Sequence, residues 1–270
     1  MHHRFHSLIV LLLILSFLGN TNLFAQDFAL RQLEDSPRHH EWVKISSGDR
    51  EVSAFVAFPE VAQKSDVLIV IHENRGLTDW VRSMADQLAE LGFIAIAPDL
   101  LSDFDDSHST TTDFENDDEA RNAIYKLDPD QVTGDLDRVV EYANAVPAGN
   151  GKVSVIGFCW GGAQSFRYAT NNPAIEKALV FYGTGPSDAS DYARIESTVY
   201  GFYGENDQRV NATIEGSEEA MEEYGKSFDY EIYPEAGHAY MRSADDPDGS
   251  EANKAAKDAS IQRIQKIFKK

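Results

Sequence analysis

Three side chains of the kind used in covalent catalysis lie in the second half of the chain. Cys159 is the only cysteine among the 270 residues and stands in Gly157-Phe-Cys-Trp-Gly161, a G-x-C-x-G pattern. Asp207 and His238 follow it in that order. A histidine can take the proton of a thiol, while a carboxylate holds the imidazole in the right tautomer and stabilises its charged form. The three residues therefore predict a cysteine nucleophile that attacks a carbonyl carbon and forms an acyl-enzyme.

The element around Cys159 is predicted to be a sharp turn between a strand and a helix. The β-branched residues of 153–156 predict a buried strand, and residues 163–169 predict a helix. The G-x-C-x-G sequence between them has the form of a nucleophile elbow, in which small flanking residues let strand and helix pack closely. The helix N-terminus favours an anionic nucleophile and supplies an N–H group to an oxyanion.

Each of the three residues also has a simpler interpretation. Cys159 could be a buried, unreactive thiol, since free cysteine is among the most buried residue types. Asp207 could be a turn residue, with Glu205 as a rival acid two positions earlier, and His238 could be an ordinary loop residue. The catalytic interpretation is favoured because all three follow predicted strands, in the nucleophile, acid, base order of the α/β-hydrolases.

The predicted elements alternate between strands and helices, which is typical of a doubly wound, mostly parallel α/β sheet with helices on both faces. The apolar run 66–71 has the composition of a central strand buried on both faces. Further strands are predicted at 51–59, which looks edge-side, and at 93–97, 153–156, 177–183, 197–204 and 229–233, and helices at 78–91, 130–146, 163–169, 211–224 and 254–268. Residues 26–45 are predicted to be an ordered lead-in at most. One α/β domain over residues 26–270 accounts for the chain.

Residues 102–119 are strongly acidic. The segment could be a lid over the site, a cation site or a solvated loop. No regular spacing of metal ligands is visible in it, so the solvated loop is favoured and no metal site is predicted.

The composition is that of a globular chain, with 42% hydrophobic and 26% charged residues. Its formal net charge of −21 disfavours nucleic acid and anionic membrane surfaces as partners. We expect a small-molecule substrate and a monomeric protein.

The N-terminus resembles a secretory signal peptide. Arg4 precedes the apolar run 8–18, and Leu23-Phe-Ala25 ends in the small residue expected before cleavage. The run is short for a bilayer span, and an uncleaved membrane anchor is the alternative. We expect residues 1–25 to be removed and the mature protein to be periplasmic or secreted, without a stable membrane anchor. With one cysteine it would have no internal disulfide.

In its motifs the sequence resembles the dienelactone hydrolase family over approximately residues 51–268. Gly157-Phe-Cys-Trp-Gly-Gly162 is similar to the nucleophile elbow of the family, Gly204-Glu-Asn-Asp-Gln-Arg-Val210 to its acid loop, and Gly237-His238 to its histidine loop. The resemblance implies a single-domain α/β-hydrolase fold, an ester or enol-lactone substrate, a cysteine acyl-enzyme and no cofactor.

The same resemblance implies four further site residues. Glu73, after the strand 66–71, matches a glutamate that takes the thiol proton when substrate binds. Arg242 matches an arginine that pairs with this glutamate and binds a substrate carboxylate, for which its planar fork is suited. The backbone N–H groups of Asn74 and Trp160 are implied as oxyanion donors. A plain surface ion pair is the alternative for Glu73 and Arg242.

Two departures from the family pattern limit the substrate. Family members that act on dienelactones carry a second substrate arginine after the Pro-Asp-Leu strand end, whereas residues 98–104 contain none. Ala239 follows the histidine where a hydroxyl residue is expected. We expect an ester or lactone with at most one carboxylate. The alternative functions are an acyltransferase or thioesterase on the same triad, and a non-catalytic redox-sensing or ligand-binding protein on a hydrolase scaffold.

Overall fold

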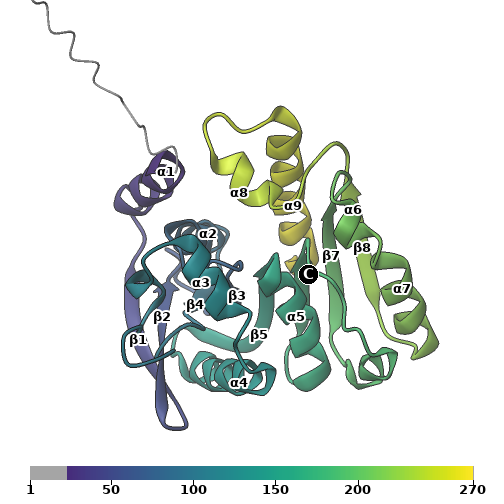
Figure 1. Ribbon diagram of the computed structural model, residues 1–270, viewed down its shortest axis with the longest axis horizontal. Helices are drawn as coiled ribbons and strands as arrows, with labels where there is room; N and C mark the ends of the chain where they lie inside the picture. The colour runs from purple at the N-terminus through teal and green to yellow at the C-terminus, as the bar shows by residue number, and fades with distance from the viewer. Residues whose placement is uncertain (1–22, 270) are drawn as a thin grey trace, which may run out of the picture.

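The computed structural model describes residues 23–269, and its centre is an eight-stranded sheet (Figure 1). The strands lie in the order β1-β2-β4-β3-β5-β6-β7-β8. Their bounds are β1 His40–Ser47, β2 Arg50–Ala57, β3 Ser65–Ile71, β4 Ile94–Pro98, β5 Gly149–Phe158, β6 Lys177–Phe181, β7 Thr198–Gly204 and β8 Phe228–Tyr233. The β1–β2 and β2–β4 pairs are antiparallel, and every pair from β4 to β8 is parallel. The predicted mostly parallel sheet is confirmed.

Helices cover both faces of the sheet. The α-helices are α1 Leu23–Glu34, α2 Asp79–Glu90, α3 Asp117–Ile124, α4 Pro129–Ala145, α5 Trp160–Asn171, α6 Gln208–Asn211, α7 Ile214–Glu223, α8 Tyr240–Asp245 and α9 Glu251–Phe268, with 3₁₀ turns η1 Thr111–Asp113 and η2 Ala189–Arg194. Apolar residues of α1, α2 and α9 pack on one face, and those of α4, α5 and α7 pack on the other. This two-sided cover is the α/β-hydrolase arrangement that the sequence predicted.

The two central strands determine where a site can form. β3 and β5 are neighbours, and their runs 67–71 and 153–158 are buried throughout because helices cover both faces there. The chain leaves β3 towards β4 on one side and leaves β5 towards β6 on the other. Such a switch in direction opens a crevice at the carboxyl ends of the two strands, where open α/β sheets bind ligands.

The N-terminal part of the fold differs from the prediction. Residues 26–45 form most of α1 and the start of β1, and β1 rather than β2 is the edge strand. β1 escaped prediction because only Ile45 in it is buried, so it lacks an apolar alternation. Residues 1–22, with most of the predicted signal peptide, lie outside the described residues. From residue 23 to residue 269, no helix is both long and apolar enough to cross a bilayer.

A buried carboxylate fastens the N-terminal segment to α2. Asp86 is fully buried and accepts hydrogen bonds from Ser36 Oγ (2.7 Å), Arg38 Nε (2.8 Å) and His40 Nε2 (2.8 Å). Burial alone would raise the pKa of the Asp86 carboxyl, but these hydrogen bonds outweigh burial and hold the pKa below its ordinary value. Asp86 therefore attaches residues 36–40 to α2, in addition to the apolar contacts of α1.

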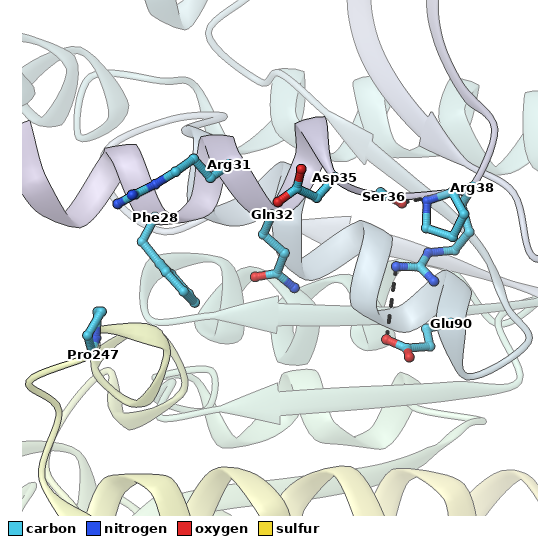
Figure 2. A pocket seen from close by; sticks show the side chains of 9 residues that line it. Phe28, Arg31, Gln32, Asp35, Ser36, Arg38, Glu90 and Pro247 are labelled. Carbon is cyan, nitrogen blue, oxygen red and sulfur yellow. Dashed lines mark hydrogen bonds and ion pairs between the residues drawn. The ribbon is translucent and has the colours of Figure 1, made fainter.

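An open pocket of about 630 Å³ lies beside α1 (Figure 2). It is lined by Phe28, Arg31, Gln32, residues 35–38, Glu90 and Pro247. Figure 2 shows Arg38 reaching towards Glu90, with Nη2 at 3.9 Å from Oε2. None of the predicted site residues lines this pocket, so the site is defined below by the contacts of its own side chains.

Candidate active site

Cys159 lies in a strained turn between β5 and α5. Its φ of 56° and ψ of −113° are values that a residue with a side chain rarely adopts. Two hydrogen bonds hold the turn: the Cys159 N–H donates to the Phe181 carbonyl (3.0 Å), and the Ala163 N–H donates to the Cys159 carbonyl (3.1 Å). A Cβ on Gly157 would overlap the carbonyl group of Gly161, so position 157 requires glycine. The local structure has the form of the predicted nucleophile elbow.

The structure brings Cys159, Asp207 and His238 together. His238 Nε2 lies 3.2 Å from Cys159 Sγ, and His238 Nδ1 lies 2.5 Å from Asp207 Oδ2. The Asp207 carboxyl is buried at the start of α6. Glu205, the rival acid, instead accepts a hydrogen bond from the backbone N–H of Glu235 (2.8 Å). Asp207 is thus the acid that contacts the imidazole.

The surroundings of His238 favour its charged form. Burial opposes a charge on the imidazole, but the hydrogen bonds with Asp207 and Cys159 outweigh burial and raise the pKa of His238 to about 9. At neutral pH both ring nitrogens then carry a proton, so Cys159 Sγ accepts in the 3.2 Å contact. The arrangement keeps a proton donor beside the sulfur, which is what a departing alkoxide needs.

Glu73 and Arg242 form an ion pair between the loop after β3 and helix α8. Arg242 Nε donates to Glu73 Oε2 over 2.7 Å. Glu73 is only 5% exposed, and its second oxygen, Oε1, has no hydrogen-bond partner among residues 23–269. Burial alone would lower the pKa of Arg242, but Glu73 outweighs burial and raises it. The pair is therefore not a plain surface ion pair, and Oε1 is able to accept a proton or a hydrogen bond.

The two backbone N–H groups implied as oxyanion donors lie at the ends of adjacent strands. Asn74 follows Glu73 after β3, and Trp160 is the first residue of α5 after β5. A first-turn N–H has no intrahelical partner. Within the described part of the chain, neither N–H group has a backbone acceptor. Unpaired N–H groups after two adjacent strands are suited to bind a developing oxyanion.

The comparison with known protein families is decisive for classification. The family model described as the dienelactone hydrolase family matches residues 52–270. The chain belongs to the dienelactone hydrolase family. Two relatives bear the name carboxymethylenebutenolidase. The one from Methylorubrum extorquens is 32% identical, and the match covers 73% of this chain and 71% of the relative. The one from Yersinia pestis is 33% identical, and the match covers 78% of this chain and 82% of the relative. This dienelactone hydrolase family member is thus a hydrolase.

A solved structure agrees with this membership at the level of the fold. It is that of a dienelactone hydrolase-like promiscuous phosphotriesterase from metagenomic libraries, with a TM-score of 0.72. The two chains are 22% identical, and the match covers 86% of this chain and 97% of the other. The likeness extends over most of this chain and nearly all of the other, and it concerns the fold alone.

Tyr182 lies in the candidate site of this dienelactone hydrolase family member but was not predicted from the sequence. Its ring packs on the imidazole of His238, with ring centres 5.2 Å apart. The side chain is buried, and within residues 23–269 its hydroxyl has no hydrogen-bond partner. Burial, reinforced by Glu73, raises the pKa of Tyr182 well above its ordinary value, so the hydroxyl stays protonated. The sequence placed Tyr182 inside a strand, whereas β6 ends one residue earlier.

The acidic segment 102–119 is largely exposed, as predicted for a solvated loop, but parts of it are regularly structured. It contains η1 and runs into α3. Its Phe104 and Phe114 pack with Ile124 in a small apolar cluster that also contacts Trp160. Among the residues that the structure describes, no group of His, Cys, Asp and Glu could hold a metal ion. Two apolar side chains of the segment therefore share a cluster with Trp160, the residue that follows Cys159.

Proposed function

We propose that this protein is a thiol-dependent hydrolase of carboxylic esters or enol-lactones. The observation that carries the proposal is the contact of Cys159 Sγ with His238 Nε2 at 3.2 Å, while Asp207 holds Nδ1 at 2.5 Å. This series of contacts, at a turn next to unpaired backbone N–H groups, supports nucleophilic attack on an acyl carbonyl. Membership of the dienelactone hydrolase family supports the same class of reaction.

In the first half-reaction, the Cys159 sulfur attacks the carbonyl carbon of the ester. A C–S bond forms, the thiol proton passes to a base, and the carbonyl oxygen becomes an oxyanion that the N–H groups of Asn74 and Trp160 bind. When the C–O bond breaks, the imidazolium of His238 gives its proton to the leaving alkoxide. The products are an alcohol or enol and a thioester on Cys159.

In the second half-reaction, water attacks the thioester. The water proton passes to His238, while Asp207 stabilises the imidazolium that forms. The C–S bond then breaks, the base returns its proton to the Cys159 sulfur, and a carboxylic acid leaves. Water supplies the only atoms added, so the cycle needs no cofactor.

Glu73 and Arg242 are proposed to link substrate binding to activation of the thiol. A substrate carboxylate that pairs with Arg242 would compete with Glu73 for the guanidinium, which leaves the glutamate free to take the thiol proton. The unpartnered Oε1 of Glu73 supports this role. Because residues 98–104 supply no second arginine, we propose a substrate with at most one carboxylate. The relatives' name refers to a butenolide, an unsaturated lactone, which supports lactones as substrates.

We also propose that the chain is exported and that cleavage follows Ala25. The supporting features are Arg4, the apolar run 8–18 and the small residue at position 25. Export separates the enzyme from intracellular aromatic catabolism, so its substrate would be an ester or lactone of the cell envelope or the surroundings.

Hydrolysis of p-nitrophenyl acetate and of an enol-lactone by the freshly reduced mature protein tests the proposal. We expect C159A and H238A each to lose activity by on the order of 10⁴-fold, because triad members act as a unit. Mass spectrometry should find the acyl group on Cys159 of the wild type.

Two other outcomes would support different functions. Transfer of the acyl group to an added alcohol or amine in preference to water would indicate an acyltransferase, and cleavage of thioesters alone would indicate a thioesterase. A change in ligand binding after peroxide treatment, with no ester or lactone ever hydrolysed, would indicate a redox-responsive binding protein.

A further inference from the structure

His72 lies directly before Glu73, is fully buried, and has no task in the mechanism above. Its Nδ1 lies 2.8 Å from the carbonyl oxygen of Glu73, and its Nε2 lies 3.2 Å from the backbone nitrogen of Leu100. A carbonyl can only accept and a backbone N–H can only donate, so the proton is on Nδ1 and the lone pair is on Nε2. Burial lowers the pKa of His72, which favours this neutral form at neutral pH.

The carbonyl that His72 contacts belongs to the same peptide unit as the Asn74 N–H. In a planar trans peptide the C=O and the N–H point in opposite directions. A hydrogen bond that fixes the Glu73 carbonyl therefore also fixes the direction of the Asn74 N–H, and it polarises that N–H through the amide. The Gly76 N–H reaches the same oxygen at 3.3 Å, which makes the His72 contact the shorter of the two.

His72 also contacts the residue that carries the other implied oxyanion donor. Its ring stacks on the ring of Trp160, with ring centres 5.5 Å apart and planes inclined by 16°. A Cβ on Gly161 would overlap the backbone carbonyls of Ile71 and His72, so the first turn of α5 packs directly on the end of β3. One buried side chain thus touches both of the segments that carry the implied oxyanion donors.

We propose that His72 is the positioning residue of the oxyanion hole. Through Nδ1 it holds the Glu73–Asn74 peptide plane, the Leu100 N–H orients its ring, and stacking on Trp160 joins the two donor segments. The inference rests on the proposed function, because an oxyanion forms only if a carbonyl is attacked. Donors aimed before the reaction stabilise the transition state without reorganisation, so His72 should act on kcat more than on KM.

The test compares H72F and H72Q with the wild type. Phenylalanine keeps a ring to stack on Trp160 but offers neither a hydrogen-bond donor nor an acceptor, whereas glutamine offers both. H108Q is the control, because His108 lies in the segment 102–119 and contacts Asp105 there. Two rates are measured: hydrolysis of p-nitrophenyl acetate, and alkylation of Cys159 by iodoacetamide. Alkylation displaces iodide at a saturated carbon and forms no oxyanion, so it reports on the thiol alone.

We expect H72F to lower kcat by on the order of 10²-fold, with KM and the alkylation rate within about threefold of the wild type. H72Q should recover to within about tenfold of the wild-type kcat, and H108Q should match the wild type. If H72F does not fold, H72L takes its place.

Three results would overturn the inference. The first is that the wild type hydrolyses the ester and H72F has a similar kcat, in which case the proposed function still stands. The second is an equal loss of ester hydrolysis and alkylation, because the defect would then lie in the nucleophile. The third is a complete lack of ester turnover by the wild type, which overturns the proposed function and this inference together.

Discussion

Replacement of Asp207 by asparagine keeps the shape of the side chain but removes its charge and one acceptor. In the wild type, one carboxylate oxygen accepts from His238 Nδ1 (2.5 Å) and the other from the Val210 N–H (3.4 Å). An asparagine has one acceptor and one NH₂ donor, so it can serve only one of these two N–H groups. With the amide oxygen towards Val210, the NH₂ group faces Nδ1 and forces the imidazole proton onto Nε2. In that tautomer Nε2 cannot take a proton from the attacking water.

The expected loss in kcat/KM for D207N is on the order of 10⁴-fold, equivalent to about 5 kcal/mol of transition-state stabilisation. The pKa of His238 should also fall, because burial remains while the main stabiliser of the charged ring is gone. The wild-type pKa of about 9 lies above the unfolded value of about 6.5. The stability from the charged ring is therefore fully present below pH about 6.5 and is lost as the pH rises through about 9. Urea unfolding at several pH values should show this loss in the wild type and not in D207N.

E205Q is the matched control for D207N. Glu205 lies two positions away, and its carboxylate accepts from the backbone N–H of Glu235. We expect E205Q to keep kcat/KM within about threefold of the wild type, because its side chain does not contact the imidazole. Equal losses of kcat/KM in E205Q and D207N would refute the assignment of Asp207, provided that circular dichroism shows both variants to be folded. A D207N variant that retains about a tenth of wild-type activity would do the same.

Three further predictions concern stability and processing. D86A should lose about 3 kcal/mol in urea unfolding, because it removes the buried partner of Arg38 and leaves only the exposed Glu90 at 3.9 Å. The pKa of Asp86 is lowered in the folded protein, so the wild type should lose this advantage as the pH falls below about 4. G157A should be destabilised by about 1–3 kcal/mol or more in thermal melts, because its new methyl group overlaps a backbone carbonyl. The control G134A adds a methyl group in open space on α4, so it should be as stable as the wild type or more stable. Expression with export should give a mature protein whose intact mass begins at Gln26, and a mass that includes residues 1–25 would refute cleavage after Ala25.

The buried parts of the fold could be predicted because burial leaves a pattern in the sequence. A buried surface requires apolar side chains. The apolar run of β3 therefore predicted a strand at its position, and the periodic apolar residues of α2 and α4 predicted helices at theirs. The alternation of strands and helices then predicted a doubly wound sheet. Cys159 and His238 could be predicted as site residues because each follows a predicted strand. The contact between them is a consequence of that topology.

Exposed or short elements, and contacts made only in the folded protein, could not be predicted from the sequence. β1 is an exposed edge strand with one buried residue, so its sequence does not alternate between apolar and polar residues. α8 has only six residues, which is too short to show a repeated apolar spacing. Tyr182 lies directly after β6 with a φ of 41°, a backbone conformation that a residue with a side chain rarely adopts and that the sequence does not announce. The tautomer of His72 depends on a backbone N–H from the end of β4, a contact that only the folded sheet creates.

The distribution of the site along the chain has a consequence for the time at which activity arises during folding. Cys159 lies in the turn between β5 and α5, but its proposed base follows β8 and its proposed acid follows β7. These two strands join the sheet through parallel pairs with long crossovers. Contacts between residues far apart in sequence form slowly. A chain that lacks everything after β7 would still contain the sequence of the elbow but no base. Esterase activity should therefore rise later than strand formation during refolding, and a newly made chain would carry an unactivated thiol until its last segment has folded.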